Sequence, residues 1–475
     1  MLRKDRFCIL VAVLLLFCYF TVPALGDEIA GSPNLSVASG SHSLDAQFPL
    51  LGMQEQVKNA KSIVLYELNT KTLLYTWNAD AQMYPASLVK IMTALIAVEK
   101  GKMDDVVVVK KSVIDTIPYD AMSADLQADE VLSLEELLYC MLVDSANDAA
   151  AVIADHISGS QDAFVQEMNN YAQALGCTGT QFVNAHGLHN DQQYTTARDM
   201  AKILEKAMGN EIFTTIYSTI NYTIAATNKS EERILSSGNF LMNTVDGMEI
   251  YYDTRVSGGR TGVTTSGDRC LAVTAEDSGL KVISILMGAE SEYVENGYAV
   301  KSFGGFNETK KLLDLAFSGL KPAQVLYDGQ ILTQYSVIGG DSKVYAGVNI
   351  SASTVLPDNI TEQDLSYRYT NLSEELNAPI DAGQKLSDVQ VWYGGLCVAQ
   401  AELYAMNSVH PLGTNVNAEV NDGMSSGWIW VIVVVIIVAL LAACAVLVLY
   451  LIGRIRIISA RNRSKRYRRG RRRSR

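Results

Sequence analysis

With 475 residues, of which 48% are apolar, the chain is too long for one ordinary domain and can bury more than one core. Its net charge of −12 is unevenly distributed: residues from Gly453 onward carry +12 and the first 26 carry +2, so subtraction leaves −26 on residues 27–452. A body this acidic excludes nucleic acid as a partner. Seven cysteines without a C-x-x-C pair exclude a disulfide-built scaffold and predict unpaired, buried thiols.

The first 55 residues contain a predicted secretory signal and a spacer. A basic start at Leu2–Arg6 precedes the apolar run Phe7–Val22, and Ala24-Leu25-Gly26 offers small residues at a cleavage position. These features predict a signal peptide over residues 1–26, while retention of the segment as an uncleaved anchor stays open. Residues 27–55 are rich in Ser, Gly, Ala and Asn and predict a flexible spacer.

From residue 56 to residue 320 the pattern predicts one α/β domain. Ser62–Glu67 and Thr72–Trp77 are strand-like and are joined by a short turn, which predicts a β-hairpin. The region 104–210 is mostly helical in pattern. The segments predicted after it are apolar strands at Arg269–Ala275 and Lys281–Met287 and a helix at Glu308–Phe317. Because strands lie at both ends with helices between them, we expect one sheet formed from the two ends, with a helical insert.

The rest of the chain divides into a β domain, a linker, a membrane span and a basic tail. Residues 322–405 contain short alternating segments separated by Gly, Asp and Asn, which predicts a small all-β sandwich. After the polar linker 406–427, residues 428–452 lack charge and carry aromatic residues near both ends, which predicts a transmembrane helix. The basic residues of 453–475 predict a cytoplasmic tail and an extracytoplasmic body, with anionic lipid as the partner of the tail.

The segment Tyr84–Leu95 carries the first candidate for catalysis. Ser87 follows a proline and precedes Lys90 by three residues, at the start of an apolar run that predicts a buried helix. This spacing places both side chains on one face, in a first turn that favours developing negative charge. A serine beside a lysine amine is a nucleophile with a base that needs no histidine. The pattern alone is weak, because Ser278 and Ser318 also begin Ser-x-x-Lys matches.

Ser145 and Asn147 form the second candidate group. They follow a predicted helix whose start carries a capping box formed by Ser133 and Glu136. A serine and an amide two residues apart at a helix end can face one cleft. There the serine can relay a proton and the amide can bind a peptide carbonyl.

The third candidate group, Gly258–Thr264, comes just before a predicted apolar strand. Its glycines allow a substrate backbone to approach closely. Arg260 beside Thr261 can bind a carboxylate. The three groups occur in this order along a chain with a predicted secretory signal, and the ordered set is far more specific than any of its members.

These segments resemble those of the D-alanyl-D-alanine carboxypeptidases, the low-molecular-mass penicillin-binding proteins of the serine DD-peptidase family. The resemblance runs from about Ser62 to Ala405. The matching segments are Tyr84–Thr93, Ser145–Asp148, Asn184–Leu188, Tyr194–Asp199 and Val256–Cys270. The resemblance implies a DD-peptidase/β-lactamase-like fold of the α/β class, with an antiparallel sheet flanked by helices and a helical subdomain, followed by the small all-β domain.

The resemblance also implies a reaction and a site. The enzyme would remove the terminal D-alanine from peptidoglycan stem peptides ending in D-Ala-D-Ala, with β-lactams as inhibitors and with no cofactor or metal. Ser87 would be the acylated nucleophile, Lys90 its general base and Ser145 a proton relay. The substrate-binding residues would be Asn147, Arg260, Thr261, Gly262 and Val263, with the backbone N–H groups of Ser87 and Val263 as the oxyanion hole.

One departure and several alternatives remain. The family usually has lysine where this chain has Arg260, which keeps the charge but does not readily release a proton. A DD-endopeptidase would use the same residues, a β-lactamase of class A would need a Glu-x-x-Leu-Asn segment, which this chain lacks between the second and third groups, and a non-catalytic wall-binding scaffold is the third alternative. A zinc site at His186, His189 and Asp191 is not expected, because glycine interrupts the spacing and H-E-x-x-H is absent.

Overall fold

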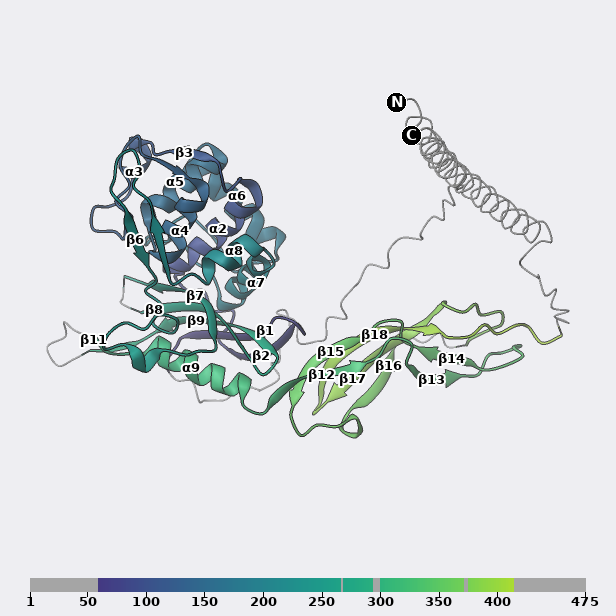
Figure 1. Ribbon diagram of the computed structural model, residues 1–475. Coiled ribbons are helices and arrows are strands. Elements are labelled where there is room, and N and C mark those ends of the chain that lie inside the picture. The colour runs from purple at the N-terminus through teal and green to yellow at the C-terminus, as the bar shows by residue number, and fades with distance from the viewer. Residues whose placement is uncertain (1–58, 266–267, 294–299, 371–374, 414–475) are drawn as a thin grey trace, which may run out of the picture. The chain divides into compact units, whose positions relative to one another are not determined.

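The computed structural model describes residues 59–265, 268–293, 300–370 and 375–413. The sheet of its α/β domain has the strand order β2-β1-β9-β8-β7, with every neighbouring pair antiparallel (Figure 1). The five strands are β1 (Ser62–Glu67), β2 (Thr72–Trp77), β7 (Val256–Val263), β8 (Arg269–Asp277) and β9 (Leu280–Ala289). Strands from the two ends of the domain therefore meet at the β1–β9 pair, which confirms the prediction of one sheet formed from both ends.

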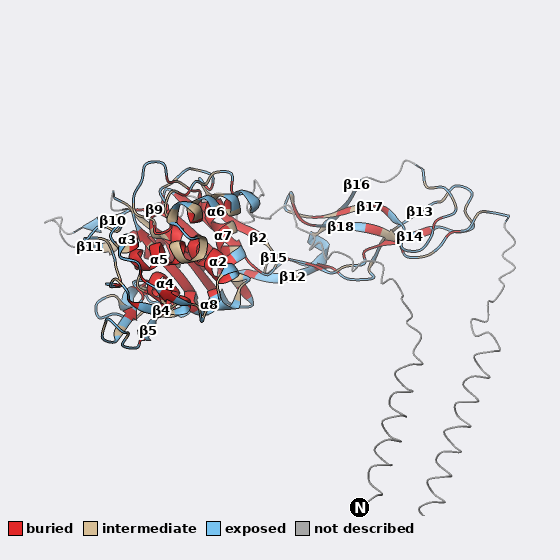
Figure 2. Ribbon diagram, turned by 90° about the horizontal axis from the view of Figure 1, so that it is seen from above, coloured by how far each residue is buried: buried red, intermediate tan, exposed pale blue. Residues whose placement is uncertain are grey.

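Both faces of this sheet are buried, because successive side chains point to opposite sides of a strand. Val64 and Tyr66 of β1 pack into one apolar cluster, whereas Ile63 and Leu65 pack into a second. Figure 2 shows the central strands in the colour of buried residues. The sheet is thus the common wall of two cores.

Helices cover one face and hold the first core (Figure 1). They are α2 (Val89–Lys100), α3 (Lys111–Ile114), α4 (Leu134–Val143), α5 (Asn147–Ser158), α6 (Gln161–Ala174), α7 (Ala197–Met208) and α8 (Glu211–Tyr217). Two small hairpins accompany them, β3 (Val106–Val108) with β4 (Val131–Ser133) and β5 (Asn221–Ile224) with β6 (Arg233–Ser236). The α4 start has the predicted capping box, in which Ser133 and Glu136 bond each other's backbone N–H groups.

A single long helix covers the opposite face. This helix, α9 (Gly304–Phe317), packs on β8 and β9 and completes the second core with aromatic residues such as Phe306. It begins four residues before the predicted start at Glu308. Its first two residues are buried glycines, and a Cβ there would clash with the Glu290 carbonyl oxygen or with the Leu271 side chain. The short strands β10 (Ser291–Tyr293) and β11 (Val300–Phe303) precede it, and the short helix η2 (Glu249–Tyr251) contacts it.

The predicted small all-β domain is confirmed as two antiparallel sheets around a third core. One sheet pairs β12 (Leu320–Leu326) with β15 (Ala352–Pro357), and the other has the order β13-β14-β18-β17-β16. The strands of the second sheet are β13 (Ile331–Tyr335), β14 (Val344–Gly347), β16 (Ser366–Thr370), β17 (Lys385–Tyr393) and β18 (Leu396–Ala405), with η3 (Glu362–Asp364) before β16. A separate small unit pairs Gly339–Asp341 with residues 410–412.

Other sequence predictions have mixed outcomes. Cys140, Cys177, Cys270 and Cys397 form no disulfide within the described residues, and all four are buried, as expected. Gly258–Thr264 precedes the apolar strand β8, as predicted, and most of it lies within the edge strand β7. No helix among the described residues is long and apolar enough to span a membrane. The predicted signal, spacer, transmembrane helix and tail lie outside those residues.

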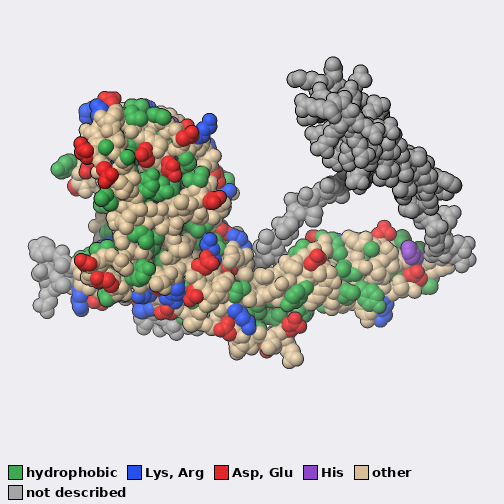
Figure 3. Space-filling view, viewed as in Figure 1, with side chains coloured by type: hydrophobic (Ala, Val, Ile, Leu, Met, Phe, Trp, Pro, Cys, Tyr) green, Lys and Arg blue, Asp and Glu red, His purple; other side chains and the backbone are tan. Residues whose placement is uncertain are grey.

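On the face shown in Figure 3, the α/β domain carries both acidic and basic side chains, and no large area carries charge of only one sign. Acidic side chains are spread over its helical part, and basic ones are interspersed with them.

Candidate functional site

Ser87 lies on η1 (Ala86–Leu88), a 3-10 turn that leads directly into α2. The sequence predicts the first turn of a helix, and the structure differs only in the tighter winding of that turn. Ten of the twelve α2 residues are buried. Since each large apolar side chain buried there contributes about 1.5–3 kcal/mol, the helix fixes the position of the serine in front of it. Ala86 has a positive φ of 47°, a strained conformation for a residue other than glycine.

Lys90 extends from the first turn of α2 and is completely buried. Its Nζ donates to Ser87 Oγ at 3.1 Å, to Asn147 Oδ1 at 2.7 Å and to the His186 carbonyl oxygen at 2.5 Å. Burial lowers the pKa of the Lys90 amine well below its ordinary value, and the positive charge of Arg260 lowers it further. A neutral amine next to Ser87 can accept the hydroxyl proton.

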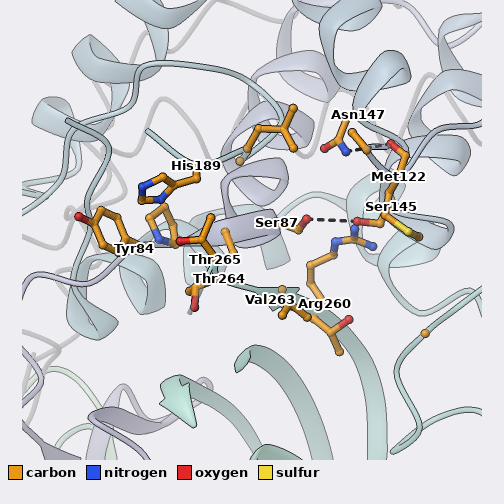
Figure 4. A pocket seen from close by; sticks show the side chains of 18 of the residues that line it. Tyr84, Ser87, Met122, Ser145, Asn147, His189, Arg260, Val263, Thr264 and Thr265 are labelled. Carbon is orange, nitrogen blue, oxygen red and sulfur yellow. Dashed lines mark hydrogen bonds between the residues drawn. The ribbon is translucent and has the colours of Figure 1, made fainter. Parts of the chain in front are cut away.

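Ser145 and Asn147 lie where α4 ends and α5 begins. Ser145 has a φ of +67°, and this left-handed turn directs its hydroxyl to Ser87, where Oγ donates to Oγ at 3.2 Å (Figure 4). Asn147 Nδ2 donates to the Met122 carbonyl at 2.8 Å, so the amide is held between this carbonyl and Lys90. The two predicted groups therefore meet at one nucleophile although 58 residues separate the serines.

β7 closes the other side of the site. It is an edge strand of the five-stranded sheet in the described structure, and it passes directly by the serine turn. A Cβ at Gly262 would lie 2.9 Å from the backbone nitrogen of Ser87, so only glycine allows this approach. Thr261 and Val263 line the same cavity as Ser87.

Arg260 directs its guanidinium from β7 toward Ser87 and Ser145 (Figure 4). The side chain is buried, and Nη1 donates to the Leu142 carbonyl at 2.6 Å. Nε and Nη2 have no hydrogen-bond partner within the described residues. Burial lowers the pKa of Arg260 to about 10, so the group remains a cation at neutral pH. A buried cation with unused donors is suited to an anionic ligand.

These residues surround a cavity of about 450 Å³. Seven of the eight predicted site residues line it, while Lys90 lies behind this wall and contacts two of the lining residues, Ser87 and Asn147. Tyr84 and His189, whose rings meet edge to face with centroids 4.8 Å apart, line another part of the wall. The cavity is large enough for the end of an extended peptide.

Sequence reasoning missed four groups at this site. Three are backbone carbonyls, of Met122, Leu142 and His186, which orient Asn147, Arg260 and Lys90. No residue type encodes such a contact, so no sequence signal could have identified them. The fourth is the carboxylate of Asp144, which lines the cavity and whose position directly before Ser145 was a usable signal.

The histidine segment has a structural role. His186 Nδ1 accepts from the Leu188 backbone N–H, and burial lowers the pKa of this imidazole to about 3. Asn184 Oδ1 accepts from the Gly187 N–H and thereby shapes the turn that presents the His186 carbonyl. Across the described ranges, no cluster of three His, Cys, Asp or Glu side chains is arranged to hold a metal ion.

A serine paired with a buried lysine, a second serine and an amide in contact with them, and a cation on the adjacent strand define an active-serine peptidase of the penicillin-recognising class. The family model described as D-alanyl-D-alanine carboxypeptidase matches residues 51–291, more than half of the chain, and the model described as penicillin-binding protein 5, C-terminal domain, matches residues 321–411. The chain therefore belongs to the D-alanyl-D-alanine carboxypeptidase family, and it is a serine-type hydrolase.

Individual relatives agree with this assignment. The D-alanyl-D-alanine carboxypeptidase DacA of Haemophilus influenzae is 29% identical over 390 residues, which cover 79% of this chain and 92% of the relative. DacC of Escherichia coli is 29% identical over 394 residues, with the same two coverages. A crystal structure of penicillin binding protein 5 from Haemophilus influenzae superposes with a TM-score of 0.60 at 29% identity, covering 74% of this chain and 98% of the other.

Proposed function

We propose that the enzyme removes the terminal D-alanine from peptidoglycan stem peptides ending in D-Ala-D-Ala, through an acyl-enzyme on Ser87. The observation that carries this assignment is the contact of Ser87 Oγ with both Lys90 Nζ and Ser145 Oγ, at 3.1 and 3.2 Å. One partner can take the proton from the nucleophile and the other can pass it on.

In the first step the Ser87 oxygen attacks the carbonyl carbon of the penultimate D-alanine, and its proton moves to the neutral Lys90 amine. The carbonyl oxygen becomes an oxyanion, which the backbone N–H groups of Ser87 and Val263 stabilise. The tight contact of Gly262 with the Ser87 backbone supports this role, because it brings the two segments that carry these donors together.

In the second step the C–N bond breaks and the leaving D-alanine amine receives the proton through Ser145. Arg260 and Thr261 hold the terminal carboxylate of the substrate, and Asn147 binds the peptide backbone. The two unpartnered guanidinium nitrogens of Arg260 support carboxylate binding. Water then hydrolyses the Ser87 ester and releases the shortened peptide. A β-lactam would acylate the same serine.

We also propose that residues 428–452 anchor the enzyme in the membrane with its body outside, and that the basic tail contacts anionic lipid. The support is the uncharged, aromatic-flanked sequence and the twelve basic residues that follow it. Residues 1–26 would direct export.

The activity is tested with the purified full chain and a stem pentapeptide ending in D-Ala-D-Ala. Mass spectrometry should detect free D-alanine, and Ser87→Ala should abolish its release. Parallel reactions with a cross-linked stem-peptide dimer and with a penicillin measure endopeptidase and β-lactamase turnover. Absence of D-alanine release by the native chain, or equal release by Ser87→Ala, would contradict the proposal.

A further inference from the structure

Two opposite charges line the cavity without contacting each other. Asp144 follows the last residue of α4 and is half-buried, and its carboxylate makes no hydrogen bond or ion pair within 4 Å among the described residues. Arg260 retains two buried nitrogens without partners. The guanidinium is bonded to the carbonyl of Leu142, two residues before Asp144, so both groups lie at the same helix terminus.

The surroundings of Asp144 disfavour its charge. Burial, together with the carboxylates of Asp148 and Asp125, raises its pKa to about 6 against the lowering effect of Arg260. A position at the carboxyl end of α4 also places it near the negative end of the helix dipole. The elements packed around α4 also carry other titratable or charged groups, which include Lys90, Glu99 and Lys100 on α2, Asp155 and His156 on α5, Glu211 and Tyr217 on α8, Tyr222 on β5 and Arg233 on β6, with Glu130 and Asp120 in the segment before β4.

We propose that Asp144 is the internal counter-charge of Arg260 in the free enzyme, and that the terminal carboxylate of the substrate binds at Arg260 together with a proton taken up by Asp144. This inference rests on the proposed function, because it assumes that Arg260 receives the terminal carboxylate. The proposal gives Asp144 a role in substrate affinity, whereas the family resemblance implies no role for this residue.

The reason is electrostatic. A bound peptide carboxylate puts two carboxylates beside one guanidinium, and neighbouring carboxylates raise each other's pKa. Between the pKa of Asp144 in the free enzyme and its higher pKa in the complex, binding is accompanied by proton uptake. Affinity for the peptide should therefore be constant below about pH 6 and fall as pH rises above it, by at most tenfold per pH unit.

The test uses binding, which separates it from catalysis. The full chain with Ser87→Ala is titrated by calorimetry with a stem pentapeptide ending in D-Ala-D-Ala, in buffers of different ionisation enthalpy, between pH 5.5 and 7.5. We expect the Kd to rise about tenfold over this range and nearly one proton to be taken up at pH 7. The same peptide with a C-terminal amide should bind without proton uptake.

Variants provide matched controls. Asp144→Asn in the same background should bind the carboxylate peptide about tenfold more tightly at pH 7, with a Kd that no longer depends on pH. Asp120→Asn removes the same charge from an exposed position on the same cavity and should keep the pH dependence of the parent.

The two proposals fail in distinguishable ways. Peptide binding with no proton uptake, or an unchanged pH profile in Asp144→Asn, would overturn the role of Asp144 even if the native chain releases D-alanine. Weaker binding in Asp144→Asn would show that the carboxylate contacts the substrate directly and would also overturn it. Proton uptake is measured on the Ser87→Ala chain, which keeps Asp144. The proposal can therefore be tested even if Asp144→Asn does not fold.

Discussion

At the scale of single residues, Arg260 has two effects on the chemistry at Ser87. Its unpartnered nitrogens offer a site for a carboxylate, and its charge lowers the pKa of Lys90. The second effect does not require Arg260 to release a proton. The replacement of the usual lysine by arginine is therefore compatible with catalysis, because a cation that stays charged still lowers the pKa of the neighbouring amine.

Replacing Arg260 separates these effects. Arg260→Ala should slow acylation at neutral pH by at least about tenfold, because it removes a charge-assisted partner of the carboxylate. It should also raise the pKa of Lys90, so that the acylation rate increases over a higher pH range than in the native chain. Arg260→Lys should keep most of the rate and the position of the profile. A fluorescent penicillin measures acylation in each variant, and equal rates in both would contradict the carboxylate-binding role.

Asp144 also predicts a stability effect with a defined sign. Its pKa of about 6 in the folded protein lies above the ordinary aspartate value of about 3.9, so ionisation favours the unfolded chain. The resulting loss of stability develops as pH rises from about 4 to about 6 and is constant above that. Asp144→Asn should therefore raise Tm at pH 7.5 and leave it unchanged near pH 3.5. Thermal unfolding at both pH values measures this, and a variant that is less stable at pH 7.5 would contradict it.

The convergence of the candidate site residues was predictable because side-chain type and spacing encode it. Ser87 with Lys90 and Ser145 with Asn147 were identified from helical settings that the structure confirms. The missed contacts are between a side chain and a backbone carbonyl far away in sequence, such as Lys90 with His186. A carbonyl has the same chemistry in every residue, so only the folded chain determines which one is used.

At the scale of elements, strands with a clear sequence pattern were predicted accurately, and strands with a weak pattern were not. β1 and β2 have the predicted bounds, because both alternate cleanly around a short turn. The β5–β6 hairpin was missed because its strands are only four residues long and half polar, with an eight-residue connection in place of a tight turn. Tertiary contacts therefore determine this hairpin more than local preference does.

The loop that presents the His186 carbonyl should depend on one glycine. Gly187 has a φ of +88°, and a Cβ there would lie 2.1 Å from the carbonyl oxygen of Ala86, within η1. Gly159 has a φ of +78° but open space around its Cβ position. Alanine at either position costs about 1–2 kcal/mol from its backbone conformation alone. Only Gly187→Ala also displaces the serine turn.

We therefore expect Gly159→Ala to lower Tm slightly and keep the penicillin acylation rate within about twofold. Gly187→Ala should lower Tm by more and reduce acylation at least about tenfold. Thermal unfolding and fluorescent penicillin labelling of both variants provide the comparison. If the two variants acylate equally fast, contact between this loop and η1 does not position Ser87.

At the scale of the whole molecule, the insertion of helices into a sheet made from both ends explains why the site draws on distant segments. Ser87, Ser145 and Arg260 come from the start, the middle and the end of the catalytic domain. Closing the sheet through the β1–β9 pair is what brings β7 against η1. Sequence order alone predicts that such a sheet forms, but not which strand is its edge.

The proposed membrane attachment would be the property of the whole chain that most affects its access to peptidoglycan. A spanning helix at 428–452 and a basic tail at 453–475 would hold the enzyme by different forces. Burial of about 25 apolar residues is insensitive to salt, whereas attraction of basic residues to anionic lipid is screened within about 8–10 Å at moderate ionic strength. Truncation together with salt washing therefore distinguishes them.

The full chain and a chain ending at residue 452 should both remain in the membrane fraction after a wash with 1 M salt, and a chain ending at residue 427 should be soluble. All three should bind fluorescent penicillin equally, since the site lies between Tyr84 and Thr265. Release of the full chain by salt would show that lipid attraction alone holds it. In intact cells, an impermeant penicillin should label the full chain, because the positive-inside rule places the body outside. Labelling only after lysis would contradict that orientation and, with it, access of Ser87 to the wall.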